Sequence, residues 1–325
     1  MALDNKTIFV SGSTGMVGSS ILRQIIENCP TLGVRACRHT TEPVVKDRRI
    51  EYIRGDLRLL DDCRKMVRGA DCVVMAAGYG GGVKNTNSFP WQKINENLAL
   101  NKQMLEAASL EGVKRVIFIG SATLYQEFTG SIREQDLDWN KDPHGAHFAF
   151  GWTMRYIEKL CMFLNKRFGI EIIVVRAGNI FGPFDKFDPE TSNFIPALIR
   201  KAVDKMEPFE VWGSADVTRD VLYSDDLARA IIMIMNMDAA SYDVFNLGSG
   251  VATKVGDVVR WALKFARHTP ADIRYIQDKP TTIKSRVLDC SKIKNSLGWQ
   301  PKYSVEEGIR DTLQWWMENK RGWKK

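Results

Sequence analysis

A glycine-rich segment near the start of the chain constrains its fold more than any other feature. The segment Gly12-Ser13-Thr14-Gly15-Met16-Val17-Gly18 follows an apolar stretch at 7–11 and opens an amphipathic stretch at 16–28. Glycines spaced in this way permit a tight turn, the close approach of a pyrophosphate and close packing of a helix on a strand. Any strand-to-helix turn can use glycine, but this position favours a dinucleotide-binding site. The expected cofactor contacts are Gly12, Thr14, Gly15, Met16, Val17 and Gly18.

Short apolar segments alternate with helical patterns through the first half of the chain. Further strands are predicted at 33–37, 50–53, 72–75, 116–120 and 172–176, with helices at 95–110 and 151–168. Apolar strands separated by helices indicate a parallel sheet covered on both faces. We therefore expect an α/β fold, with a doubly wound parallel Rossmann sheet at 1–177 and a smaller α/β substrate domain at 178–325. Residues from about 219 to 247 are expected to return to the first domain.

Composition narrows the classes of partner and compartment. The formal net charge of +7 is compatible with nucleic-acid binding, but the charge is spread along the chain and matches no nucleic-acid motif. We therefore favour anionic small molecules. The first residues carry no apolar signal segment, and the apolar run at 230–235 is too short to span a bilayer. The six cysteines form no CxxC pair, which favours a reduced, cytoplasmic protein with neither a disulfide framework nor a metal site.

The end of the second predicted strand bears on the choice of cofactor. An NAD site usually places an acidic residue there for the ribose hydroxyls, whereas this chain has Arg35 and Arg38. Two arginines suit the 2′-phosphate of NADP, so NADP is favoured over NAD; the alternative is a solvated loop. After the third strand, Asp56 and Leu57 are placed to meet the adenine. After the fourth, Ala76-Ala77-Gly78 can let the cofactor backbone pass closely.

Several segments, in order along the chain, are similar to one family of enzymes. They read GSTGMVG at 12–18, AAGYGGGV at 76–83, GSATLY at 120–125, NIFGPFDKF at 179–187, FIPAL at 194–198, VWGS at 211–214 and YSDDL at 223–227. Together they resemble the extended short-chain dehydrogenases/reductases, also called NAD-dependent epimerases/dehydratases, and most closely the GDP-L-fucose synthases. The resemblance implies a Rossmann fold, NAD(P) as cofactor and a nucleotide-activated sugar, GDP-linked, as substrate.

The chain departs from this family where the resemblance implies catalysis. The family uses a Tyr to exchange a proton with the sugar oxygen, a Lys to lower the pKa of that Tyr, and a Ser to hydrogen-bond the carbonyl. Ser121 matches the Ser, but Phe150 and Met154 stand at the Tyr and Lys positions, four residues apart on one helix face. The Cys and His of the epimerisation pair are replaced by Thr123 and Asn193. Any reaction must therefore use a non-standard set of acid–base groups.

Replacement groups are sought near the same pocket. His144 and His147 precede Phe150, and a histidine near its usual pKa can act as acid or base; the alternative is an ordinary loop histidine. Tyr79, in the glycine-rich loop after the fourth strand, could supply a hydroxyl near the sugar. The candidate catalytic set is Ser121, Thr123, His147 and Tyr79.

Other positions fit substrate binding better than chemistry. By resemblance, Arg219 is expected to pair with the substrate diphosphate and Asn179 to contact substrate or nicotinamide. The full expected substrate-binding set is Asn179, Asn193, Trp212, Arg219 and Lys279. Ordinary structural roles remain the alternative for each of them.

Two functions stay open from the sequence. One is an enzyme acting on a nucleotide sugar with non-standard acid–base groups. The other is a catalytically inactive relative that binds NADP or a nucleotide sugar as a regulatory or structural subunit. A nucleic-acid-binding Rossmann protein would rest on the charge alone.

The resemblance also implies a homodimer, with the helices at 95–110 and 151–168 paired across a two-fold axis. Leucine and isoleucine side chains on these two helices have a spacing that suits buried positions in such an interface. The same spacing suits packing on the sheet. The residues concerned are Leu98, Leu105, Ile157, Leu160 and Leu164.

Overall fold

A parallel sheet forms the centre of the computed structural model, which describes residues 5–80, 90–238, 241–277 and 285–323. Its seven strands lie in the order β12-β7-β5-β4-β1-β2-β3. The strands are β1 Thr7–Val10, β2 Gly33–Arg38, β3 Ile50–Arg54, β4 Cys72–Met75, β5 Arg115–Ser121, β7 Glu171–Ala177 and β12 Tyr242–Leu247. The strands predicted in the first half are confirmed to within a residue at each end, because continuous apolar runs between turns mark strands buried on both faces.

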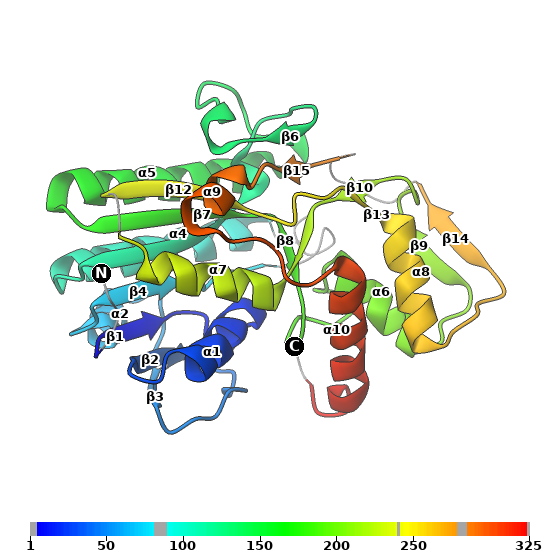
Figure 1. Cartoon of the computed structure of the whole chain (residues 1–325), viewed down its shortest axis with the longest axis horizontal. Coiled ribbons are helices and arrows are strands. Elements are labelled where there is room, and N and C mark those ends of the chain that lie inside the picture. The colour runs from blue at the N-terminus through cyan, green and yellow to red at the C-terminus, as the bar shows by residue number, and fades with distance from the viewer. Residues whose placement is uncertain (1–4, 81–89, 239–240, 278–284, 324–325) are drawn as a thin grey trace.

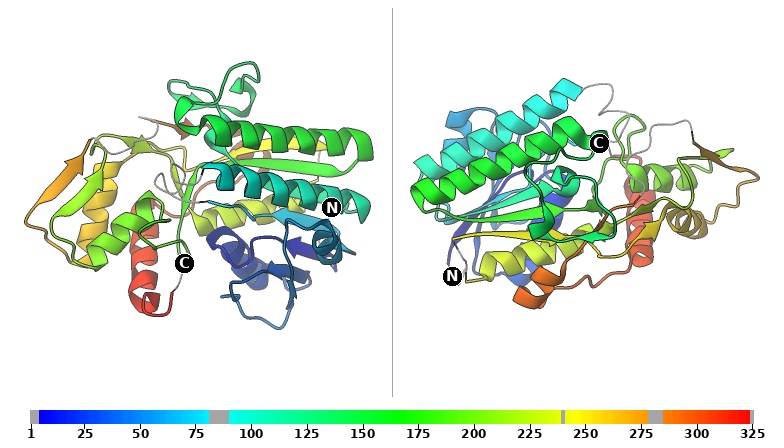
Figure 2. Two further views of the ribbon diagram at one scale, coloured as in Figure 1. Left: turned by 180° about the vertical axis from the view of Figure 1, so that it is seen from behind. Right: turned by 90° about the horizontal axis from the view of Figure 1, so that it is seen from above.

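Helices cover both faces of this sheet, and alternate strand residues point to each. Ile8 and Val10 pack into one core cluster and Phe9 into the other. On the Phe9 face lie α2 (Leu60–Val67), α4 (Pro90–Leu110) and α5 (Phe148–Phe168). On the opposite face lie α1 (Met16–Asn28), α7 (Ser224–Asn236) and α9 (Ser291–Leu297). Figures 1 and 2 show this layering, with α4 and α5 side by side in both views of Figure 2.

A smaller α/β unit stands beside the sheet, at the right of Figure 1. Its helices α6 (Phe194–Val203), α8 (Val255–Ala266) and α10 (Val305–Asn319) enclose a third core cluster. The parallel pair β9 (Phe209–Trp212) and β14 (Ile273–Ile276) packs at its side. The expected fold class, a doubly wound parallel sheet with a second, smaller domain, is confirmed. The boundary at residue 177 stays a prediction.

Short strand pairs connect the two parts of the molecule. Each has two or three residues per strand, and each links segments that are distant in sequence. They are β8 (Asn179–Phe181) with β11 (Val221–Tyr223), β10 (Thr218–Arg219) with β13 (Thr253–Lys254), and β6 (Ser131–Ile132) with β15 (Val287–Leu288). After β11 the chain returns to the main sheet, where α7 packs against α1 and β12 lies beside β7.

The structure separates two roles that the sequence had left open for the apolar residues of α4 and α5. Leu105, Ile157 and Leu164 are buried in the core of their own chain, so they pack on the sheet and are not available to a partner. Leu98 and Leu160 are only partly buried against the same core. The exposed apolar side chains of α5 are instead Trp152, Tyr156, Phe163 and Phe168.

Three further observations bear on the sequence expectations. All six cysteines are free thiols. Over the described ranges, no helix combines the length and the apolar character needed to cross a membrane. The same ranges hold no group of three or more His, Cys, Asp or Glu side chains arranged for a metal ion.

Candidate functional site

The glycine-rich loop between β1 and α1 is packed so closely that two of its glycines cannot be replaced without movement. Gly12 has φ of +64°, and a Cβ built on it would lie 2.6 Å from the carbonyl oxygen of Ala76. A Cβ on Gly18 would lie 2.8 Å from Cα of Ser13. The backbone N–H of Gly15 donates to the carbonyl of Gly12 at 2.9 Å, which closes the turn. These contacts join the loop to the end of β4, as the predicted cofactor motif requires.

Buried hydroxyls fix the same edge of the sheet. Ser11 Oγ accepts hydrogen bonds from the backbone N–H groups of Ala76 at 3.0 Å and Ala77 at 3.1 Å. Ser13 Oγ donates to the carbonyl of Cys37 at the end of β2. Helix α1 begins here with Gly15 as its N-cap, no side-chain cap and no acidic residue in its first turn. Its first N–H groups and its positive dipole end therefore suit a pyrophosphate, and the loop fits a bound dinucleotide.

The two arginines predicted to contact the cofactor ribose lie in different surroundings. The Arg35 Nε donates to Glu51 at 3.1 Å, and the guanidinium also donates to the carbonyls of Lys65 and Arg68. Those carbonyls belong to the end of α2, which runs back toward the amino edge of the strands. Arg35 therefore does not reach the carboxyl edge, where the glycine loop lies.

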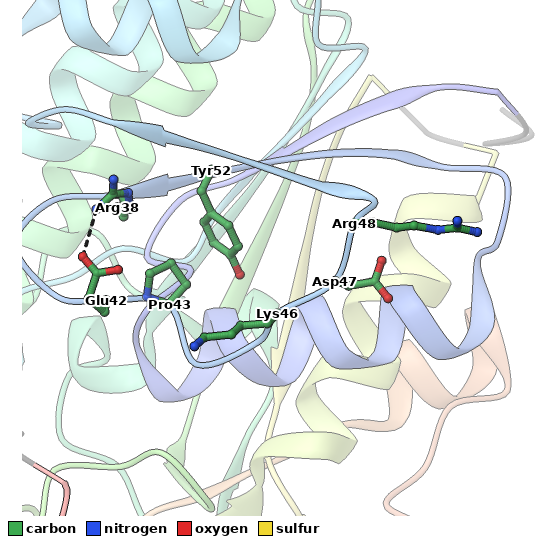
Figure 3. Close-up of a pocket in the computed structure, with 7 residues that line it drawn as sticks. All are labelled: Arg38, Glu42, Pro43, Lys46, Asp47, Arg48 and Tyr52. Carbon is green, nitrogen blue, oxygen red and sulfur yellow. Dashed lines mark hydrogen bonds and ion pairs between the residues drawn. The ribbon is translucent and has the colours of Figure 1, made fainter.

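Arg38, the last residue of β2, remains at that edge. Its Nη1 donates to Glu42 at 2.9 Å, and the two line a surface pocket of about 490 Å³ together with Lys46, Arg48 and Tyr52, as Figure 3 shows. The Tyr52 hydroxyl donates to the carbonyl of Val45 at 2.7 Å and shapes the floor of this loop. Arg38 thus lies beside the expected ribose position, with Lys46 in the loop that follows, whereas Arg48 extends away from both in Figure 3.

The predicted adenine contacts lie at the same edge. Asp56 follows β3 and forms an ion pair with Arg58 at 2.6 Å. Hydrogen bonds from Arg58 hold the pKa of Asp56 at about 2, so this carboxylate is ionised at neutral pH. Leu57 is half-buried against the core beside it. Gly78 lies further along the edge, after Ala76 and Ala77.

Ser121 and Thr123 come together at the end of β5. Thr123 Oγ1 donates to Ser121 Oγ at 3.0 Å, and Ser121 caps a short 3-10 helix, Ala122–Leu124. Helix α5 approaches this turn closely, because a Cβ on Gly151 would lie 2.7 Å from the carbonyl oxygen of Thr123. Residue 150 is therefore carried next to the Ser121–Thr123 turn.

The structure gives no substitute function to the side chains at 150 and 154 themselves. Phe150 packs against the core cluster on the α5 face, and Met154 is a full member of that cluster with 4% of its surface exposed. Neither side chain can exchange a proton. Tyr125, two residues after Thr123, is buried and donates its hydroxyl proton to Asn246 Oδ1 at 2.6 Å, so it serves an internal network.

The candidate replacement His147 lies in a strongly electropositive pocket. Burial, with the charges of Arg286, Lys93, His144 and Arg219, lowers the pKa of His147 to about 3. The imidazole is therefore neutral at physiological pH and cannot serve as a cationic acid. His144 caps the short helix Gly145–His147 by accepting the backbone N–H of Ala146 at 3.1 Å.

Tyr79 is held in place by α4. Its backbone exchanges hydrogen bonds with the side chain of Asn97, which accepts from its N–H at 3.1 Å and donates to its carbonyl at 3.0 Å. Lys186, from the loop after β8, lies over the Tyr79 ring at 5.8 Å and donates to the carbonyl of Gly80 at 2.8 Å. The structure thus joins the two loops that border the expected sugar position.

The predicted substrate residues spread over the short strand pairs and the smaller unit. Asn179 Nδ2 donates to the carbonyl of Asp220 at 3.0 Å. Asn193 stands exposed at the N-cap of α6 and makes no capping bond with its side chain. Trp212 ends β9 and is 41% exposed. Arg219 lies on β10 and donates to the carbonyl of Thr218 at 2.8 Å. Lys279 lies outside the described residues.

A second arginine that sequence reasoning missed stands beside Arg219. Thr218 Oγ1 donates to Ser285 Oγ at 2.8 Å, and the N–H of Asp220 donates to the carbonyl of Arg286 at 3.1 Å. Arg286 is only 8% exposed, and its Nε and Nη2 have no hydrogen-bond partner among the described residues. Burial and the charge of Arg219 lower the pKa of Arg286 to about 10. In the sequence Arg286 is a single basic residue before a two-residue strand, and no local pattern marks it as a binding residue.

Lys93 is the other functional candidate that the sequence did not single out. It lies on α4, and its Nζ stands 4.3 Å from the centroid of the Phe150 ring. Burial lowers its pKa. A lysine in an amphipathic helix usually faces water, so the sequence pattern indicated a solvated side chain.

Comparisons with known proteins agree with this arrangement. Residues 8–248 match the model of the NAD dependent epimerase/dehydratase family. A GDP-L-fucose synthase from Sinorhizobium fredii is 29% identical over 98% of this chain and 97% of its own length. A GDP-mannose 3,5-epimerase from Arabidopsis thaliana is 29% identical over 96% of this chain and 82% of its own length.

Solved structures of the same architecture superpose over nearly the whole chain. A UDP-glucose 4-epimerase from Thermotoga maritima has a TM-score of 0.84 at 22% identity, covering 96% of this chain and 99% of that one. A dTDP-glucose 4,6-dehydratase from Streptomyces venezuelae, solved with NAD bound, has a TM-score of 0.85 at 20% identity, covering 98% and 99%. At these identities the likeness concerns the fold.

Proposed function

Because the chain belongs to the NAD-dependent epimerase/dehydratase family, we propose that it binds NADP and a GDP-linked sugar and acts on that sugar by redox or epimerisation chemistry. The acid–base groups are non-standard, since Phe150 and Met154 are neutral and packed. The protein works, on this proposal, as a cytoplasmic homodimer. The GDP preference is supported by relatives that are named for GDP-sugars along most of this chain.

The cofactor part of the proposal is supported by the glycine loop and by the end of β2. Gly12 and Gly18 leave space that any Cβ would fill, and the N-terminus of α1 offers its N–H groups to the pyrophosphate. Arg38, with Lys46 in the loop that follows β2, supplies the positive charge that favours a 2′-phosphate. A bound nicotinamide dinucleotide would supply the hydride donor or acceptor. The chain's own residues would hold and orient the sugar.

The observation that carries the substrate proposal is the pair Arg219 and Arg286. A buried guanidinium with two nitrogens that donate no hydrogen bond is costly unless an anion accepts from them. Arg286 has this arrangement, and the carboxylate of the neighbouring Asp220 is already used by Ser249 and Leu288. A diphosphate presents the oxygen acceptors that two adjacent guanidinium groups require.

Ser121 and Thr123 then lie at the sugar end of the site. Their hydroxyls form a coupled pair, so one can donate to a sugar oxygen while accepting from the other. Positioning of the substrate and hydrogen bonds to its reacting oxygen can still accelerate the reaction substantially when another catalytic group is absent.

One observation favours the alternative of an inactive, ligand-binding subunit. Met154 stands at the position of the missing lysine and is part of the core cluster, so this position now serves packing. On this alternative the cofactor loop and the arginine pair bind ligand, and no hydride moves.

The experiment that tests the proposal measures binding first and chemistry second. GDP-mannose, GDP and GMP are titrated by calorimetry into wild type, Arg286→Met and Arg310→Met, the last an exposed arginine paired with Asp311. Losing a charged hydrogen-bonding group should weaken GDP and GDP-mannose binding by roughly 10- to 100-fold in Arg286→Met. GMP binding should change less, and Arg310→Met should resemble wild type.

Chemistry is then followed with NADPH and GDP-4-keto-6-deoxymannose, and with NADP and a panel of GDP-, UDP- and dTDP-sugars. A change in nicotinamide absorbance supports the enzyme. Tight binding of cofactor and GDP-sugar with no change across the panel supports the binding subunit. Equal GDP affinity in wild type and Arg286→Met would contradict the diphosphate assignment.

A further inference from the structure

Lys93 occupies a place in the site that its sequence position does not suggest. It belongs to α4, whereas the missing Tyr and Lys both belong to α5. The two helices lie side by side, and the Lys93 amine stands over the face of the Phe150 ring at 4.3 Å. An ammonium this close to a ring centroid gains a cation–π attraction, which holds the side chain in place.

The turn of α5 that carries Phe150 is also the turn that meets Ser121 and Thr123. Glycine at position 151 allows this contact, because the Cβ of any other residue there would collide with Pro143 and with the carbonyl of Thr123. An amine resting on Phe150 is therefore next to the segment that carries the hydroxyl pair.

The charges around Lys93 place it in the same pocket as the arginines. Its positive charge is one of those that lower the pKa of His147, together with Arg286, His144 and Arg219. His147 comes from the turn before α5, Arg219 from β10 and Arg286 from the segment before β15. The amine is thus close enough to His147 for its charge to act on the imidazole.

Of the charged groups that act on His147, Lys93 is a proton carrier with no capping role, whereas His144 accepts the backbone N–H of Ala146. His147 is neutral, since its pKa falls to about 3. The Arg286 guanidinium keeps its proton at neutral pH, since its pKa, although lowered, is about 10. A lysine that is largely removed from water changes protonation more easily than an exposed one, as burial lowers the pKa of Lys93.

We propose that Lys93, supplied by α4, is the proton-transferring residue of this site and takes the place of the Tyr–Lys pair that α5 lacks. This rests on the proposed function. In the oxidative direction the O–H bond of a sugar hydroxyl breaks and its proton bonds to the neutral Nζ. The C–H bond of the same carbon breaks, its hydride leaves to the nicotinamide dinucleotide, and C–O becomes C=O. In the reductive direction the ammonium returns the proton.

The first test measures how the reactivity of the Lys93 amine depends on pH and on bound ligand, without requiring turnover. Lysines of the intact protein are acylated at a series of pH values, and the rate at each is followed by peptide mass analysis. Lys102, exposed on the same helix and paired with Glu106, is the internal control. The midpoint for Lys93 should lie at lower pH than that for Lys102. NADP with GDP-mannose, each at ten times its Kd, should slow labelling of Lys93 by about tenfold and leave Lys102 unchanged.

The second test separates proton transfer from charge. Lys93→Met and Lys93→Arg should both lower the rate of hydride transfer by about 10²- to 10⁴-fold. Arginine keeps the charge but cannot transfer the proton, so a role in positioning alone would be rescued by Lys93→Arg. The wild-type pH profile should contain an ionisation that both variants lack. NADPH binding by each variant reports that it is folded, and Lys102→Met is the matched control.

The outcomes separate this inference from the proposed function. Hydride transfer in Lys93→Arg within a few-fold of wild type overturns the proposal. If ligands bind but the wild-type protein moves no hydride with any sugar of the panel, Lys93 has no proton-transfer role and the proposal is overturned. If hydride moves, labelling of Lys93 like that of Lys102 also overturns it. If neither NADP nor a GDP-sugar binds, the proposed function fails and this inference falls with it.

Discussion

At the scale of single residues, two arginines three positions apart on β2 have different surroundings, and only one can select the cofactor. Arg38→Ser should weaken NADPH binding by roughly 10- to 100-fold, because a charge-assisted contact to the 2′-phosphate is lost. NADH, which has no such phosphate, should bind almost as before. Fluorescence titration of the bound nicotinamide measures both.

Arg35 provides the matched control. Its guanidinium is tied to Glu51 and to carbonyls of α2, so Arg35→Gln should leave the ratio of NADPH to NADH affinity unchanged. Equal loss of NADPH and NADH binding in Arg38→Ser, or a changed ratio in Arg35→Gln, would contradict the placement of the phosphate.

A buried carboxyl makes stability depend on pH. Asp185 is 5% exposed, its Oδ2 has no partner among the described residues, and burial raises its pKa to about 7 from an ordinary value of 3.8. Between these two values unfolding releases a proton, so the contribution of Asp185 to stability falls as pH rises. Asp185→Asn removes this effect. The unfolding free energy of Asp185→Asn minus that of wild type should therefore increase from pH 4 to pH 8, by at most about 4 kcal/mol.

Urea unfolding of both proteins at several pH values measures this difference. A difference that stays constant with pH would show that the Asp185 carboxyl titrates normally in the folded protein.

At the scale of elements, the approach of α5 to the Ser121–Thr123 turn depends on Gly151. A Cβ there would lie 2.5 Å from Cβ of Pro143, so Gly151→Ala should force the helix away and cost about 1–3 kcal/mol of unfolding free energy. Gly145→Ala is the control, because a Cβ at Gly145 meets nothing within 4 Å. It should change stability by less than about 1 kcal/mol. Urea unfolding distinguishes them, and similar values for the two variants would show that α5 does not need this close contact.

At the scale of the whole molecule, α4 and α5 present an outer face that the chain itself does not cover. Tyr156 and Phe163 on α5 are 55% and 54% exposed, and Trp152 lies on the same stripe. We expect this face to pair across a two-fold axis, because exposed aromatic side chains in one stripe favour burial against a second copy. Tyr156→Glu should shift the protein from dimer to monomer in sedimentation velocity. Met317→Glu, an equally exposed apolar position on α10, should leave the dimer intact.

A monomeric wild-type protein at micromolar concentration would contradict this assignment. So would a Tyr156→Glu variant that remains dimeric.

The sequence by itself determined the fold class and the position of the cofactor loop, because both depend on local patterns of residue type. Apolar runs between turns predict buried parallel strands, and Gly12 and Gly18 sit where only glycine fits between strand and helix. The neutral side chains at 150 and 154 are likewise visible without coordinates. What these patterns describe is periodicity and residue type within a few positions, which needs no knowledge of distant segments.

Only the tertiary structure decided which charged side chains share the site. Arg35 turned toward α2 while Arg38 stayed at the carboxyl edge, a difference in side-chain direction that residue type does not reveal. Lys93 met Phe150 because α4 and α5 pack together, and Arg286 met Arg219 because short strands join distant loops. Those contacts are set by how helices pack on the sheet and which groups lose water as they do. From the sequence alone a charged residue is therefore predicted to face water, and only its neighbours in the fold show that it is buried.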